Sequence, residues 1–115
     1  MQVQTKPKTI NDKTVPIYPD DLLRQQYLAG ERNFPNWDLR NADLRGLNLR
    51  DINLQGANLS GALLIGTNLQ NANLENADLS YSHICSANLT FANLAGANLD
   101  NTNLDGAVFD NPWWD

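Results

Sequence analysis

The sequence predicts an all-β solenoid, a quadrilateral β-helix of four coils, and three observations support this. An apolar residue recurs at every fifth position from Phe34 to Phe109, sixteen times without a slip. A small residue, usually Ala, stands two positions before most of these apolar residues. Asn or Asp fills most positions directly before them, and Gly often follows two positions after. The chain therefore repeats a five-residue unit over most of its 115 residues.

A five-residue period fits neither a helix nor a flat sheet. In an α-helix each step of five residues rotates the next side chain by about 140°, so the apolar residues would point in all directions. In a strand an odd step would place successive leucines on opposite faces. The period is satisfied if the backbone turns a corner every five residues and each Leu points to a common axis. Four units then make one square coil.

The other positions of the unit follow from this geometry. The residue two before each Leu also points inward near a corner, where only a small side chain fits. The Asn or Asp before the Leu suits turns and is expected to face water. Gly two positions after the Leu, as at Gly46 and Gly56, provides the backbone freedom that a corner requires.

The repeat resembles that of the pentapeptide repeat family, whose consensus is A(D/N)LXX. Ala42–Gly46 and Ala97–Asn101 match this consensus. The resemblance implies a right-handed coil, which the spacing alone does not show. Leucine-rich repeats are the main rival, but their units have 20–29 residues with uneven leucine spacing.

The sequence predicts four segments. Residues 1–18 are polar and are expected to form a flexible leader. Residues 19–30 are expected to form a capping helix, because Pro and two Asp precede its apolar residues and Gly30 can end it. Residues 31–111 carry the repeats, and residues 112–115 form a C-terminal segment with two Trp. The helix resembles the N-terminal cap of some cyanobacterial members of the family.

The two ends of the repeat depart from the consensus. In the first coil larger residues replace the expected Ala, as suits a junction with a cap: Arg32, Trp37, Leu47 and Ile52. At the other end, Trp113 and Trp114 either fold over the last layer of leucines or contact a second chain. Both readings remain open.

Charge is distributed unevenly along the chain. All eight Lys and Arg lie at or before Arg50, so residues 1–50 carry +2 and residues 51–115 carry −7 of the net −5. The predicted solenoid has a positively charged N-terminal end, called the base, and a negatively charged C-terminal end, called the tip. Asp100, Asp105 and Asp110 lie on the last coil. These charges serve either head-to-tail attraction or docking, or they only keep the protein in solution.

One face carries apolar and reactive side chains where polar residues are expected. They define the candidate interaction patch: Leu63, Ile65, Tyr81, His83, Cys85 and Phe91. Exposed apolar patches often mark contacts with partners. Tolerated drift of surface residues is the alternative.

The sequence argues against an enzyme, a cofactor and a metal site. His83 and Cys85 flank an inward residue and point outward together, but no orienting group or oxyanion site accompanies them. One His and one Cys fall short of a zinc site, and no phosphate-binding loop occurs. The acidic charge disfavours nucleic-acid binding. No membrane span or signal peptide is evident, so a cytoplasmic location is expected.

Three functions are consistent with these observations. The first is a noncatalytic scaffold with a surface for an unidentified protein partner. The second follows from the resemblance: some members of the family resemble duplex DNA and modulate DNA gyrase. The third is an architectural role, in which the chain is a monomer or assembles end to end as a homodimer.

Overall fold

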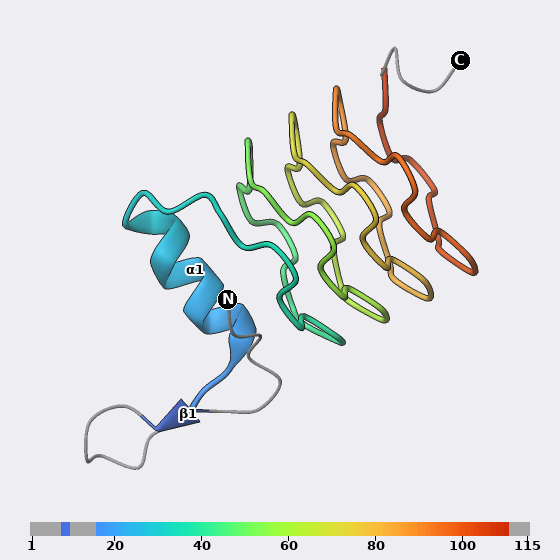
Figure 1. Ribbon diagram of the computed structural model, residues 1–115. Coiled ribbons are helices and arrows are strands. Elements are labelled where there is room, and N and C mark those ends of the chain that lie inside the picture. Colours follow the sequence, from blue (N-terminus) through green and yellow to red (C-terminus); the bar gives the residue numbers. More distant parts are fainter. Residues whose placement is uncertain (1–7, 10–15, 111–115) are drawn as a thin grey trace.

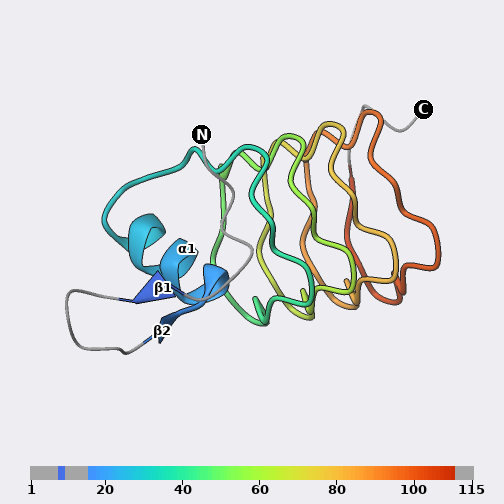
Figure 2. The same ribbon diagram turned by 60° about the horizontal axis from the view of Figure 1, so that its bottom comes forward.

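The computed structural model describes residues 8–9 and 16–110. Two strands, β1 (Lys8–Thr9) and β2 (Pro16–Ile17), pair antiparallel and precede the helix α1 (Pro19–Leu28). The chain then winds into a stack of similar coils, with α1 beside the first coil and the last coil at the far end (Figures 1 and 2). Only residues 8–9 and 16–18 of the predicted leader are described, so its flexibility stays a prediction.

Parallel bridges between residues twenty apart hold the coils together. They run from Asn33↔Asn53 to Asn88↔Val108. Around each bridge, one backbone N–H bonds to the preceding coil and the next bonds to the following coil. The Asn58 N–H donates to Trp37 O at 2.9 Å, and the Leu59 N–H donates to Asp78 O at 2.7 Å. One turn of the chain is therefore four five-residue units, as the spacing predicts.

The solenoid contains no strand longer than a single bridging residue in the part of the chain that the structure describes. The predicted solenoid is therefore built, in its described coils, from isolated bridges and not from extended strands. The reason lies in the unit itself, because two of its five residues form a turn and two point inward beside a corner. Only one residue per unit remains to pair with both neighbouring coils.

Four faces result, each named here by its bridging residues. Face 1 carries residues 33, 53, 73 and 93, and face 2 carries residues 38, 58, 78 and 98. Face 3 carries Asp43, Leu63, His83 and Asn103, and face 4 carries residues 48, 68, 88 and 108. Since the chain meets the faces in this order, face 3 lies opposite face 1.

The core is the column of inward residues that the five-residue period predicts. The apolar residue at every fifth position is called the central residue of its unit. The twelve central residues from Phe34 to Leu89 are at most 1% exposed, and the small residues beside them, such as Ala57 and Ala62, are fully buried. Leu94, Leu99, Leu104 and Phe109 in the last turn are only partly buried. The apolar column is thus sealed along its length and less covered at its C-terminal end.

The corners use a left-handed backbone conformation at the second residue after each central residue. Gly56 and Gly61 have φ near +70° there, as the sequence predicts. Non-glycine residues also occupy this position, including Asn36 (φ 63°), Tyr81 (φ 60°) and Phe91 (φ 61°). Asn tolerates this region, whereas a bulky residue at positive φ is an outlier.

The Asn and Asp residues act in the turns by a mechanism that their position does not reveal. They occupy the bridges, and the side-chain Oδ1 accepts the backbone N–H two residues on, as in Asn58 to Ser60 at 3.0 Å. This is an Asx turn, which stabilises the corner. It occurs in twelve units: those of residues 38, 43, 48, 53, 58, 68, 73, 78, 88, 93, 98 and 103.

Truncation of an interior leucine should destabilise the protein more than the same truncation in the last coil. Leu79→Ala removes a fully buried side chain and is expected to lower the free energy of unfolding by about 2–5 kcal/mol. Leu99→Ala, in the same column but partly exposed, should lower it by clearly less. Equilibrium urea unfolding compares the two variants. Equal losses would contradict the assignment of the apolar column as a core with one less covered end.

Candidate interaction surface

The outer side of face 3 carries most of the predicted patch. Leu63 and His83 are bridged to each other, and the N–H of Gly66 donates to the carbonyl of Cys85 at 3.0 Å, which aligns the two coils. Neighbouring coils of a ladder lie about 4.8 Å apart. Ile65 is 40% exposed and His83 is exposed, whereas Leu63 and Cys85 are half-buried. These four residues form two adjacent rungs of one face.

Tyr81 extends the patch, but Phe91 does not. Tyr81 is 63% exposed and lies at the corner between faces 2 and 3. Phe91 is 50% exposed, but its corner lies between faces 4 and 1, diagonally opposite that of Tyr81. The sequence-based prediction includes Phe91 because it is expected near a corner next to this face, but its corner adjoins faces 4 and 1. From here on, the face-3 patch means Leu63, Ile65, Tyr81, His83 and Cys85.

The two bridging residues of the patch lack the Asx turn that the other faces use. Leu63 and His83 stand where twelve units have an Asn or Asp whose Oδ1 accepts the amide two residues on. Within the described chain, the amides of Ile65 and Cys85 have no such acceptor. Face 3 regains the Asx turn at Asn103. Apart from the first unit, where Pro35 has no N–H, and the last unit, where Val108 is the bridging residue, the departure is thus confined to two stacked units.

His83 and Cys85 do not form a nucleophile pair in this arrangement. The Cys85 thiol has a weak contact with the carbonyl of Asn103 at 3.9 Å and no hydrogen bond to His83 in the part of the chain that is described. A Cys and His pair requires direct contact and an orienting group. The described residues also contain no group of three or more His, Cys, Asp or Glu able to hold a metal ion.

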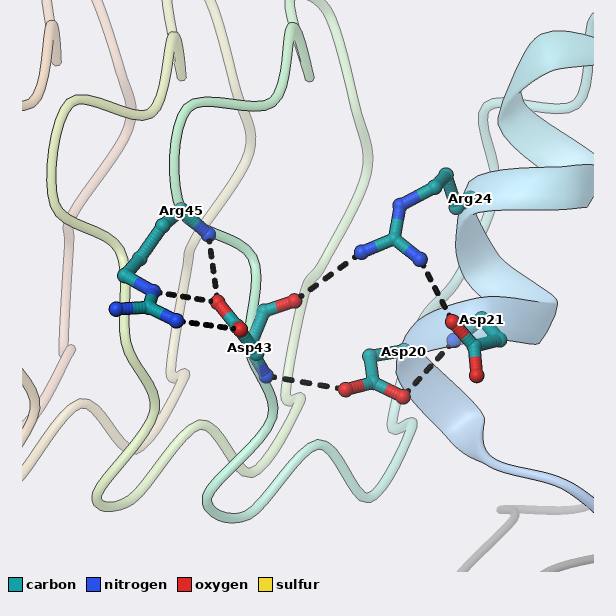
Figure 3. A network of polar contacts seen from close by, with 5 residues as sticks. All are labelled: Asp20, Asp21, Arg24, Asp43 and Arg45. Atoms are coloured by element: carbon teal, nitrogen blue, oxygen red, sulfur yellow. Dashed lines mark hydrogen bonds and ion pairs between the residues drawn. The ribbon is translucent and has the colours of Figure 1, made fainter.

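A second surface lies at the base, where α1 meets the first coil. Asp20 Oδ2 accepts the Asp43 N–H at 3.1 Å, and Arg24 donates to the Asp43 carbonyl at 3.3 Å (Figure 3). Arg24 also pairs with Asp21 at 2.7 Å. In later coils, a bridging residue's N–H is bonded by a preceding coil, as with Leu63 to Ala42 at 2.9 Å. Side chains of α1 therefore supply the bonds that a preceding coil would make.

Further contacts hold α1 against the first coil. The Tyr27 hydroxyl donates to the Arg50 carbonyl at 2.7 Å, and the Arg32 guanidinium lies 3.7 Å from the centre of the Tyr27 ring. Leu23 is fully buried. Trp37 is buried beside Phe34 in an edge-to-face arrangement at 5.1 Å, and its indole N–H has no partner among the described residues. Unusually large residues of the first coil thus lie where the helix packs.

The predicted basic charge of the base is largely compensated within single units. Arg40 forms a bidentate pair with Asp38, and Arg45 forms one with Asp43. Hydrogen bonds from the Arg45 side chain and backbone lower the pKa of Asp43 from about 3.8 to about 2. The Arg40 side chain likewise lowers the pKa of Asp38. A shallow pocket of about 230 Å³ lies near these pairs, lined by residues that include Tyr18, Asp20, Leu39 and Arg40.

The predicted contacts of Trp113 and Trp114 lie outside the described residues. The acids of the last coil, Asp100, Asp105 and Asp110, are exposed. No helix in the described ranges is long and apolar enough to cross a membrane.

These features place the chain among known proteins. The pentapeptide repeat pattern matches in eight copies, over residues 32–61, 57–84 and 86–111. The chain belongs to the pentapeptide repeat family, and the solenoid is accordingly a right-handed β-helix.

Solved structures of cyanobacterial pentapeptide repeat proteins are similar to this chain. Rfr23 from Cyanothece 51142 is 41% identical, with a TM-score of 0.65, over 68% of this chain and 56% of that one. HetL from Nostoc sp. strain PCC 7120, a protein involved in regulating heterocyst differentiation, is 29% identical with a TM-score of 0.42. That match covers 66% of this chain and 46% of HetL. This chain thus spans about half the length of these two relatives, and no curated protein matches it.

The lowered pKa of Asp43 predicts that acid destabilises the N-terminal end of the solenoid. Because its pKa is lowered on folding, Asp43 stabilises the fold above about pH 3.8, and this contribution is lost as the pH falls toward 2. Asp43→Asn, which keeps the Asx acceptor, should be less stable than the unmodified protein at neutral pH and approach it near pH 2. Urea midpoints measured across this range test the prediction. Asp100→Asn is the control, and parallel curves for Asp43→Asn and the unmodified protein would contradict it.

Proposed function

We propose that this protein is a noncatalytic scaffold of four coils, closed at its base by α1, that binds a protein partner through the face-3 patch. Members of the pentapeptide repeat family are generally structural, noncatalytic repeat proteins. The rigid ladder fixes the positions of outward side chains before a partner arrives, so little conformational entropy is lost on binding.

The closure of the base is supported by the substituted ladder bonds. Asp20, Arg24 and Tyr27 bond to backbone groups of the first coil that later coils bond through their own backbone. Open edges of ladders otherwise invite pairing with other chains, and terminal units of repeat proteins are specialised to prevent it. The helix thereby directs contacts to the sides and the tip of the rod.

The absent Asx turns of Leu63 and His83 are the observation that carries the proposed partner surface. At these two positions, local stability favours Asn or Asp, as twelve other units show. A sequence that departs from a local rule without a local gain is typical of functional sites. The departure also places apolar and aromatic groups together on one exposed face, which is typical of contact surfaces.

Restoring the Asx turns should stabilise the protein. Leu63→Asn and His83→Asn each provide an acceptor for the amide two residues on, which is worth about 0.5–1.5 kcal/mol in the free energy of unfolding. Urea unfolding of each variant measures the gain. A clear loss of stability in both variants would show that the native side chains stabilise the fold, and would remove the main argument for a binding role.

The partner itself is sought by affinity capture from the native cell, with two matched double variants. Leu63→Asp with Ile65→Asp should abolish capture of a specific protein, because it introduces two charges into the patch. Asn53→Asp with Gln55→Asp, at the equivalent positions of the opposite face in the same coil, should leave capture unchanged. Circular dichroism confirms the fold of both. Undiminished capture by the first variant would exclude the patch.

A further inference from the structure

Face 3 changes in character from the base to the tip. Its bridging residues form four stacked rungs: Asp43, Leu63, His83 and Asn103. The residues two positions further on form a second column on the same face: Arg45, Ile65, Cys85 and Asp105. This second column runs from a cation at the base, through two residues of the face-3 patch, to an anion at the tip.

The guanidinium of Arg45 retains donors for a further partner. Its Nε and Nη2 donate to Asp43 at 2.8 Å each, and its Nη1 has no hydrogen bond to any residue that the structure describes. The Arg45 side chain is 55% exposed, and Asp105 is exposed at the other end of the face. Three steps of about 4.8 Å separate the two rungs.

The corner between faces 2 and 3 is equally uneven. One residue of each coil occupies this corner with positive φ: Asn41, Gly61, Tyr81 and Asn101. Tyr81 is 63% exposed, whereas Gly61 in the adjacent coil has no side chain. Gly or Asn suits this backbone conformation better than a bulky residue does. The stability of the corner therefore gives no reason for a tyrosine.

We propose that the protein partner of the face-3 patch is a second copy of this chain, packed face to face in an antiparallel orientation. This inference rests on the proposed function, because it names the partner of the same surface. The dimer is held by the complementary order of side chains along face 3, which matches its own reverse.

A twofold axis along the rungs, midway between Leu63 and His83, generates the dimer. It reverses the direction of the stack but keeps each column opposite the same column of the other copy. Leu63 then meets His83 of the other copy, and the ring of Tyr81 meets Gly61. The bulky residue of the corner thus lies against the position that has no side chain, twice in each dimer.

Charge favours the antiparallel arrangement over a parallel one. In the antiparallel pair, Arg45 of each copy meets Asp105 of the other, so opposite charges face each other at both ends of the interface. A parallel pair would bring the tips together, with Asp100 and Asp105 of one copy beside those of the other. Like charges in such proximity oppose association.

The size of the face predicts a weak dimer. Four rungs are roughly 19 Å tall, and the molecule measures 27 and 24 Å along its two shorter axes. The face therefore offers about 500 Å² at most, below the roughly 800 Å² per partner of a standard interface. We expect a reversible dimer that forms at high protein concentration.

Sedimentation equilibrium over a range of protein concentrations measures the dimer, and two corner variants locate it. Tyr81→Asn should weaken dimerisation by about tenfold or more, because an aromatic anchor is lost from both copies. Phe91→Asn makes a similar change at a corner with the same backbone conformation, away from face 3, and should have no effect. Asn is favoured in this conformation, so both variants should fold. Equal effects of the two variants would overturn the proposal.

A second pair of variants tests the antiparallel register. Asp105→Arg should weaken dimerisation by about three- to tenfold, because it sets a cation against Arg45 of the other copy. Asp100→Arg makes the same change of charge at the equivalent position of face 2 in the same coil. It should not weaken the dimer. If the two variants dimerise equally well, the proposed register is wrong.

The outcomes distinguish this dimer from the proposed function. A dimer that the Leu63→Asp and Ile65→Asp variant abolishes supports both. A protein that stays monomeric at every concentration overturns the dimer, but the proposed function stands if the same double variant loses a different protein in affinity capture. A dimer that the double variant leaves intact is formed elsewhere on the chain and overturns the inference. A monomer that captures nothing refutes both.

Discussion

Backbone hydrogen bonds between coils are the constraint on which the rest of this structure depends. A unit of five residues leaves one residue per face to pair with both neighbours, so no coil satisfies its own backbone. Buried or half-buried amides and carbonyls that lack partners are costly. Each coil therefore depends on the coil before it and the coil after it. The first coil has no preceding coil to supply these bonds.

The two ends meet this constraint differently. At the base, polar side chains of α1 bond to backbone groups of the first coil, and large residues of that coil are buried. The last described coil has partly exposed leucines and exposed aspartates.

The sides of the rod follow a separate logic. Burial in the core requires apolar or small residues at the inward positions, and the Asx turn favours Asn or Asp at the bridging positions. Residue type is free to vary only at outward positions that are under neither constraint. Leu63 and His83 break the second rule on adjacent coils of face 3. The same departure on two stacked units places several apolar groups together, whereas a single departure would not. A rigid ladder fixes the positions of these side chains relative to one another.

The sequence by itself determined the repeat length, the inward column and the location of the helix, because a period of five residues is incompatible with any other regular arrangement of Leu. It also identified Leu63, Ile65, His83 and Cys85 as neighbours, since the spacing of twenty residues per turn places them on one face. Only the tertiary structure decided that Phe91 lies on the opposite corner, that the Asn residues act through Asx turns within the bridges, and that Asp20 and Arg24 bond to the backbone of the first coil. These features depend on where the corners fall around the square and on how α1 approaches the first coil, and neither is encoded in a linear period.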